Sequence, residues 1–247
     1  MTIRMKLHDA IMFATEKHAV EKRKGTDIDY ICHPMEVLQI LTEMNPEDDD
    51  LLIAGVLHDV VEDTGVTIEE LLERFGPRVA NLVAAHTHSK EGTWRERKHH
   101  AIDEIAAAEM DVKKIVLADK VSNLRSIYAD YQALGDELWE RFNAGKEDQR
   151  WYYSNVLDVF EPLQYDDDTR DAYWEATELF KDIFVRYFID AKAGKIWQVC
   201  GDEAWVFEKY RVTWVESDEP VSEDAVEESR LVAETLEDHW TEAAIIG

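Results

Sequence analysis

The sequence predicts a mainly α-helical protein whose C-terminal part adds a β-hairpin and an acidic helix. Apolar side chains recur at helical spacing through most of the first 160 residues, and proline or capping residues precede several of these segments. Residues 196–215 instead combine aromatic and β-branched residues around a Gly-Asp turn, which is typical of a hairpin. We therefore expect a helical bundle followed by a smaller extension.

The predicted helices follow one another along the bundle. Residues 5–20 carry a broad apolar stripe, and Pro34 suits the first turn of a helix that runs to about Glu43. The run from Leu51 to Val61 is apolar nearly all round, which predicts one buried central helix that ends at Gly65. Helical spacing or start signals predict further helices over 67–76, 77–88, 98–109, 111–131, 146–160, 170–192 and 220–243.

Composition limits the partners of the protein. Its 247 residues include 27 Lys and Arg against 54 Asp and Glu, which gives a net charge of −27. Such a charge argues against a nucleic-acid duplex or an anionic membrane as the main partner. Two cysteines imply no disulfide framework, and no apolar run reaches the roughly 20 residues that span a bilayer. We expect a soluble, cytoplasmic protein.

The character of the sequence changes near the acidic run Asp166–Asp168, which predicts a domain over 1–164 and an extension over 165–247. Residues 151–247 carry 8 basic and 24 acidic side chains, so the acidity is concentrated near the C-terminus. Three tryptophans give the predicted hairpin enough apolar area to be structural. Residues 216–247 hold so many carboxylates that we expect a solvated helix, free to cover a site or to meet a partner.

The strongest chemical signal is His58-Asp59, followed by Glu62-Asp63, within the apolar central run. Helical spacing would bring all four side chains onto one face. Burying them is costly unless a cation compensates their charge. His33 and Asp119 lie in similarly apolar surroundings. Two imidazoles and two carboxylates suit a divalent transition ion such as Mn²⁺, Fe²⁺, Zn²⁺ or Co²⁺.

Plainer interpretations stand beside this one. A His-Asp pair recurs by chance, and Glu62-Asp63 could be the polar end of a helix. Four other histidines, His86, His88, His99 and His100, could bind metal, but we interpret them as solvated helix positions. We interpret the aromatic run 151–153 as core.

Several segments together resemble the hydrolase domain of the RelA/SpoT family, a branch of the HD superfamily of metal-dependent phosphohydrolases. The main ones are Arg23-Lys24-Gly25, Tyr30-Ile31-Cys32-His33-Pro34, the run from Ala54 to Thr64, and the run from Leu117 to Arg125. The chain more closely resembles the stand-alone small alarmone hydrolases, because no synthetase or regulatory domain is discernible beside these segments. It departs from the family at Asp29, where a proline is usual.

The resemblance implies a role for individual residues. It implies metal ligands at His33, His58, Asp59 and Asp119, and an acidic pair, Glu62 and Asp63, that positions or activates the attacking water. It also implies that the substrate is contacted by Arg23, Lys24, Asn123 and Ser126, and more loosely by Lys146.

The activity implied is Mn²⁺-dependent hydrolysis of the alarmone (p)ppGpp, or of (p)ppApp, at the 3′ position, which releases pyrophosphate. Two alternatives remain. One is an HD-type phosphatase that acts on another nucleotide such as NADPH. The other is an antitoxin-like protein that neutralises a cognate alarmone synthetase, for which the acidic extension could serve as a docking surface.

Overall fold

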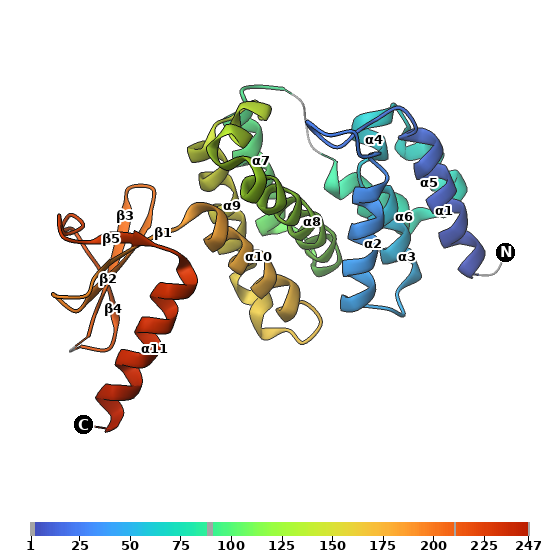
Figure 1. Cartoon of the computed structure of the whole chain (residues 1–247). Helices are drawn as coiled ribbons and strands as arrows, with labels where there is room; N and C mark the ends of the chain where they lie inside the picture. The colour runs from blue at the N-terminus through green and yellow to red at the C-terminus, as the bar shows by residue number, and fades with distance from the viewer. Residues whose placement is uncertain (1–2, 88–90, 210, 247) are drawn as a thin grey trace. The chain divides into compact units, whose positions relative to one another are not determined.

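The computed structural model describes residues 3–87, 91–209 and 211–246. Contacts divide the chain into two compact units, Met1–Leu179 and Phe180–Gly247, drawn in Figure 1. The first is helical, and the second is a five-stranded sheet with one helix, so the predicted mainly helical class is confirmed. The boundary after residue 164 stays a prediction. Among the described residues, no helix has both the length and the apolar character needed to span a membrane.

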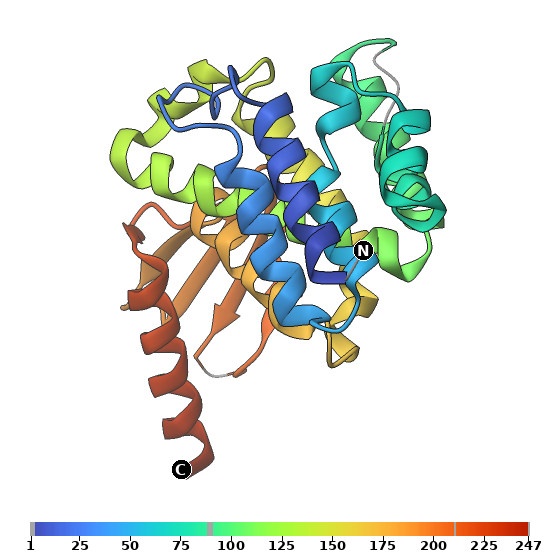
Figure 2. The same ribbon diagram turned by 90° about the vertical axis from the view of Figure 1, so that its right-hand side faces the viewer.

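The helical unit contains helices of very different length, from one turn to seven (Figures 1 and 2). They are α1 (Ile3–Lys17), α2 (Cys32–Met44), α3 (Asp49–Leu57), α4 (Val60–Thr64), α5 (Ile68–Phe75), α6 (Pro77–His86), α7 (Trp94–Ala107), α8 (Met110–Leu134), η1 (Gly135–Arg141), α9 (Lys146–Phe160), η2 (Glu161–Tyr165) and α10 (Arg170–Phe184), which continues into the second unit.

Helix α3 is the centre of this unit. Every residue from Leu51 to Leu57 is buried, and the helix contacts α1, α2, α6 and α8. Asp48 caps its first turn by accepting a hydrogen bond from the amide of Leu51. A Cβ atom at Gly55 would lie 2.2 Å from a methyl carbon of Leu41, so glycine allows α2 to approach closely. The predicted buried central helix is confirmed.

The predicted continuity of that helix is wrong. α3 ends at Leu57, and α4 begins at Val60, with a turn at His58 and Asp59. The Nδ1 atom of His58 bonds the carbonyl oxygen of Gly55 at 2.8 Å, the oxygen that an uninterrupted helix would offer to the amide of Asp59. The His-Asp pair therefore occupies a break between two helices, and α4 ends at Gly65 in the left-handed conformation.

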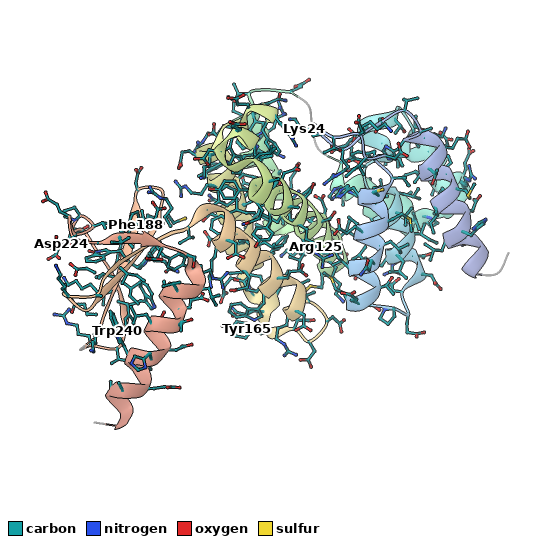
Figure 3. The ribbon with its side chains drawn as sticks, viewed as in Figure 1. Lys24, Arg125, Tyr165, Phe188, Asp224 and Trp240 are labelled. Atoms are coloured by element: carbon teal, nitrogen blue, oxygen red, sulfur yellow. The ribbon has the colours of Figure 1, made fainter. Side chains whose placement is uncertain are left out.

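The second unit is an antiparallel sheet in the order β4-β3-β2-β1-β5. One face packs against a helix through a core that includes Tyr187, Ile196, Phe207 and Trp240. The Trp240 ring stacks on Phe207 at 6.5 Å between centroids, and Figure 3 shows Trp240 pointing from its helix toward the strands. The elements are β1 (Arg186–Asp190), β2 (Lys195–Cys200), β3 (Glu203–Glu208), β4 (Trp214–Glu216), β5 (Val226–Glu228) and α11 (Arg230–Ile246).

The predicted hairpin is present as β2 and β3, joined at Gly201 and Asp202. Two other expectations for this region are wrong. Residues 186–190 form a strand instead of the end of a helix, because they pair with β2 and β5 on both sides. The acidic helix is not free of the fold, because α11 buries Ala233 and Trp240 against the sheet and its Glu237 accepts a hydrogen bond from Trp214 of β4.

Candidate metal centre

Three helical segments bring His33, His58 and Asp119 together inside the first unit. His33 lies on the first turn of α2, His58 follows α3, and Asp119 lies in the middle of α8. All three are buried, and one ligand atom from each lies within 4.8 Å of the others. The Nε2 atom of His33 is 3.1 Å from Asp119 Oδ1 and 3.6 Å from Asp59 Oδ2. The structure thus brings the four predicted metal ligands into one cluster, in which Nε2 of His58 lies 2.9 Å from Asp59 Oδ2 and 3.9 Å from Asp119 Oδ1.

A hydrogen-bonded chain fixes the ring of His33. The hydroxyl of Ser122 donates to Glu36 at 2.7 Å, because an ionised carboxylate can only accept. Ser122 has one proton, so its oxygen must accept the 2.8 Å bond from His33 Nδ1–H. Arg125 holds Glu36 in place from the same face of α8. The lone pair of His33 Nε2 is therefore directed at the carboxylates.

The ring of His58 is oriented in the same sense. Its Nδ1 atom donates to Gly55, and its buried Nε2 atom lies 2.9 Å from Asp59 Oδ2 yet makes no hydrogen bond among the described residues. Burial disfavours a charged imidazole, but Asp59 and Asp119 outweigh burial and raise the pKa of His58 to about 9. The two carboxylates therefore favour a positive charge at Nε2 of His58. A divalent cation bound there would replace the Nε2 proton.

Both carboxylates of the cluster are held in the ionised form. Burial opposes ionisation of Asp119, but Lys120 and the two histidines outweigh it and keep its pKa well below the usual range. Asn123 and Lys120 each donate to Asp119, both at 2.5 Å. The hydroxyl of Tyr30 donates to Asp59 at 2.5 Å. Two ionised carboxylates and two oriented imidazoles fit a divalent transition ion.

His86 corrects a prediction. The sequence predicts a solvated helix position for it, but it is buried at the end of α6, with Nε2 3.9 Å from Asp59 Oδ1. Burial and the charge of His58 lower the pKa of His86 to about 3, so its ring is neutral. His99 and His100 are exposed as expected, and His88 lies outside the described residues.

The predicted acidic pair is carried by α4, directly after the break. Glu62 is partly buried, and the amide of Asp63 bonds the carbonyl of Asp59 at 3.0 Å. Although part of Asp63 is exposed, desolvation of its carboxyl group and the charges of Asp59 and Glu21 raise its pKa. α4 therefore presents carboxyl groups beside the metal ligands, which suits an acid or a base acting on water.

A pocket of about 220 Å³ adjoins the metal ligands. Lys22, Arg23 and Lys24 contribute positive charge to its lining, and the predicted Asn123 and Ser126 line it as well. Asn123 accepts a bond from Arg23 at 3.2 Å while donating to Asp119, and Tyr30, also in the lining, donates to Asp59. The pocket and the metal cluster therefore share two side chains.

The remaining predicted substrate residue is held elsewhere. The Nζ atom of Lys146 bonds Asp136 at 2.8 Å and Tyr131 at 3.2 Å, and Lys146 is not among the residues that line the pocket. Of the aromatic run 151–153, Tyr152 and Tyr153 are buried as expected, and Tyr153 also lines the pocket. Asp29, which replaces the usual proline, pairs with Lys22 and closes the basic loop on itself.

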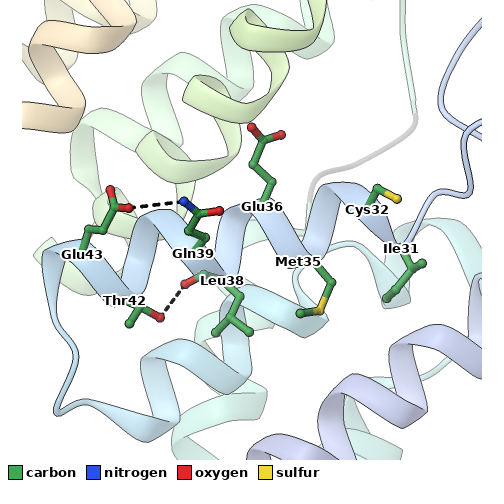
Figure 4. A pocket seen from close by; sticks show the side chains of 8 residues that line it. All are labelled: Ile31, Cys32, Met35, Glu36, Leu38, Gln39, Thr42 and Glu43. Carbon is green, nitrogen blue, oxygen red and sulfur yellow. Dashed lines mark hydrogen bonds between the residues drawn. The ribbon is translucent and has the colours of Figure 1, made fainter.

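A wider pocket runs along α2 on its other side (Figure 4). Its described lining contains Glu36 and Glu43 but no lysine or arginine, which makes it unsuited to a phosphorylated ligand. Figure 4 shows Gln39 bonded to Glu43 and Thr42 bonded to the carbonyl of Leu38 along the helix.

Sequence reasoning assigned no role to Tyr30, Glu36 and Ser122, which contact the predicted metal ligands or the residues that hold them, and it interpreted His86 as a solvated position. A signal existed for two of them. Ser122 lies three residues after Asp119, on the same face of one helix. His86 continues the apolar positions Val79, Leu82 and Val83 of α6, which placed it on the buried face.

Fold and site together define the class: a helical protein that gathers histidines and aspartates from several helices into one cluster that fits a divalent ion. The chain belongs to the HD domain family, whose model matches residues 10–165.

Relatives of known name agree with this family. The protein named guanosine-3′,5′-bis(diphosphate) 3′-pyrophosphohydrolase MESH1 from Drosophila melanogaster is 37% identical over 124 residues, which covers 49% of this chain and 69% of the relative. The human protein of the same name is 38% identical over 123 residues, with 49% and 69% covered. The chain is therefore homologous to these hydrolases, and the resemblance to the RelA/SpoT hydrolase domain is confirmed.

Two solved structures are similar to the chain. Protein lmo0812 of Listeria monocytogenes EGD-e has a TM-score of 0.56 at 33% identity, covering 60% of this chain and 96% of that one. A metazoan ortholog of SpoT, described as hydrolysing ppGpp, has a TM-score of 0.59 at 29% identity, covering 71% and 94%.

Proposed function

We propose that the protein hydrolyses (p)ppGpp at the 3′ position with Mn²⁺ bound by His33, His58, Asp59 and Asp119. The products are pyrophosphate and a guanosine 5′-diphosphate or 5′-triphosphate. One observation carries the proposal furthest: a pocket lined by Lys22, Arg23 and Lys24 shares Tyr30 and Asn123 with the metal cluster. The similarity to proteins named as hydrolases of this alarmone supports the choice of substrate.

The pocket supplies what a polyphosphorylated nucleotide needs in an acidic protein. The chain carries a net charge of −27, so an anionic substrate is repelled at long range and must be held by local cations. Arg23 can bind phosphoryl oxygens through two N–H groups, while Lys24 adds a point charge and Lys22 is held by Asp29. Asn123 then orients Arg23 from the side of the metal ligands.

Glu62 is proposed to handle the attacking water. A bound divalent ion lowers the pKa of its water so that hydroxide forms near neutral pH. Glu62 follows Asp59 by three residues, and its carboxylate would orient that water or accept its proton. Asp63, whose pKa is raised, would hold the proton that the reaction releases.

The test is a chromatographic assay of the purified chain with Mn²⁺ against ppGpp, pppGpp, ppApp and NADPH. Release of pyrophosphate from ppGpp or pppGpp, at a higher kcat/KM than for the other two, is the expected result. A preference for ppApp would mean that the protein carries out the same reaction on the adenine alarmone. Release of inorganic phosphate from NADPH alone would contradict the proposal. It would favour the alternative of an HD-type phosphatase that acts on another nucleotide.

A further inference from the structure

A third imidazole faces the predicted metal ligands. His86 ends α6, a helix that contributes no residue to the predicted ligand set. Its side chain is buried, and its ring centroid lies 5.0 Å from that of His58, while the His33 ring lies 5.1 Å from the same ring. His58 is thus in contact with two further imidazoles.

The carboxylate of Asp59 connects the three rings. Its Oδ2 atom lies near His58 and His33, and its Oδ1 atom lies 3.9 Å from Nε2 of His86. Ligand atoms around one transition ion lie about 2.0–2.2 Å from it, so two of them are separated by up to about 4.4 Å. The distances from Asp59 to Nε2 of His58, 2.9 Å, and to Nε2 of His86, 3.9 Å, both lie below that limit.

We propose that His86 is a fifth protein ligand of this metal centre. The proposal deepens the proposed function, because it concerns the same ion, but it does not depend on which nucleotide is hydrolysed. A histidine whose only role is packing has no need to direct a ring nitrogen toward an ionised carboxylate that two other imidazoles already share.

The third imidazole changes which ions the centre prefers. Carboxylate oxygens suit Mn²⁺, whereas imidazole nitrogens suit Co²⁺, Ni²⁺ and Zn²⁺ better. With two imidazoles and two carboxylates the set is balanced, and His86 adds one nitrogen to it. His86 therefore contributes more to the binding of Co²⁺ than to the binding of Mn²⁺.

The experiment compares metal binding by the full-length chain and by His86→Gln, which retains a polar side chain of similar length. Affinities for Co²⁺ and Mn²⁺ are measured by competition with a chelator, and the visible spectrum of bound Co²⁺ reports its ligands. We expect His86→Gln to weaken Co²⁺ binding at least about 10-fold, to weaken Mn²⁺ binding less, and to change the Co²⁺ bands. His99→Gln, which alters an exposed imidazole on α7, serves as the matched control and leaves all three readouts unchanged.

Unchanged Co²⁺ affinity and an unchanged spectrum in folded His86→Gln would overturn the proposal. A measurement on the unmutated chain covers the case in which the variant does not fold. In the Co²⁺-loaded protein, three imidazoles with hyperfine-shifted proton resonances support His86 as a ligand, and two such imidazoles contradict it. If the protein does not hydrolyse the alarmone, the metal affinities and the spectra of the Co²⁺-loaded protein can still be measured. The two proposals can therefore fail separately.

Discussion

The two units of the chain use their interiors differently. The helical unit buries polar side chains, among them His33, His58, His86 and Asp119, in the middle of its core. In the second unit the described core is formed by aromatic and aliphatic side chains. Its one buried carboxylate among the described residues, Asp190, accepts bonds from two turn amides and from Ser222.

This difference indicates where the chemistry lies. A buried charged group without a structural partner destabilises a fold, so it persists where it has another use. Asp190 is held within a turn, whereas His58, Asp59 and Asp119 lie in a cluster whose donor atoms fit a divalent cation. Substitutions inside the helical unit should therefore change metal binding and turnover, while substitutions in the second core should change stability alone.

The largest expected effect is on Asp59. Asp59→Asn keeps the size of the side chain but removes the charge, so we expect loss of bound metal and a loss of hydrolysis of about 10³-fold or more. Metal analysis and the alarmone assay measure these effects. Chelation should lower the melting temperature of the parent chain and leave that of the variant unchanged. Retention of both metal and activity would remove Asp59 from the ligand set.

The second prediction tests the other side of the comparison. Trp240→Ala opens a cavity between α11 and the sheet, which should lower the free energy of unfolding of the second unit by about 3–5 kcal/mol. Urea titration followed by tryptophan fluorescence gives this value. The affinity for Mn²⁺ should stay the same, and a parallel fall in that affinity would show that the two interiors are not independent.

Glu62→Gln separates chemistry from binding within the helical unit. If Glu62 handles the water, turnover falls about 10²-fold or more while bound metal and KM are retained. Steady-state kinetics with metal analysis distinguish the outcomes. A rise in KM with unchanged kcat would show that Glu62 binds the substrate. It would contradict the proposal that Glu62 orients or deprotonates the attacking water.

Ser122→Ala weakens the orientation of a ligand without removing it. The His33 ring loses the acceptor for its Nδ1–H, so the metal affinity should fall about 10-fold to 100-fold with the helical content unchanged. Chelator competition measures the affinity, and circular dichroism the helical content. Ser154→Ala, on α9, is a control of the same chemistry and should have no effect.

The smallest effect concerns pH. The hydrogen bond from Arg78 and the capping bond from Leu51 lower the pKa of Asp48, so its stabilising effect is complete above the unfolded-state pKa and disappears as the pH falls through the lower, folded-state pKa. Asp48→Ala should destabilise the protein by about 1 kcal/mol at pH 7. Urea titrations at decreasing pH should show this difference shrinking below about pH 4. A constant difference would mean that the carboxylate charge is irrelevant to the cap.

The helical fold was predictable because its signals are local. Pro34, Thr67 and Pro77 mark helix starts that the structure contains, and the apolar run 51–57 predicts its own burial. The break at His58 was not predictable from periodicity, because it results from a side-chain bond to Gly55 within an otherwise helical sequence. β1 was missed because its strand character depends on pairing with residues about 10 and 40 positions away.

The roles assigned to the site residues remain predictions, although four of the side chains lie together as the pattern required. Their spacing along the chain, from His33 to Asp119, carries no information about distance in space. The grouping of these four residues as ligands of one ion therefore came from the family resemblance. The motifs that carry the resemblance do not include His86. Position on the apolar face of α6 was the physical signal for that residue.

Tyr30 and Asn123 each touch a metal ligand and line the basic pocket. A ligand that changes the position of either side chain therefore changes the surroundings of Asp59 or Asp119. Linkage between two binding equilibria is reciprocal, so an ion that strengthens nucleotide binding by some factor is itself held more tightly by that same factor. If the proposed function is correct, a nucleotide bound in the pocket would therefore strengthen the binding of the ion beside it.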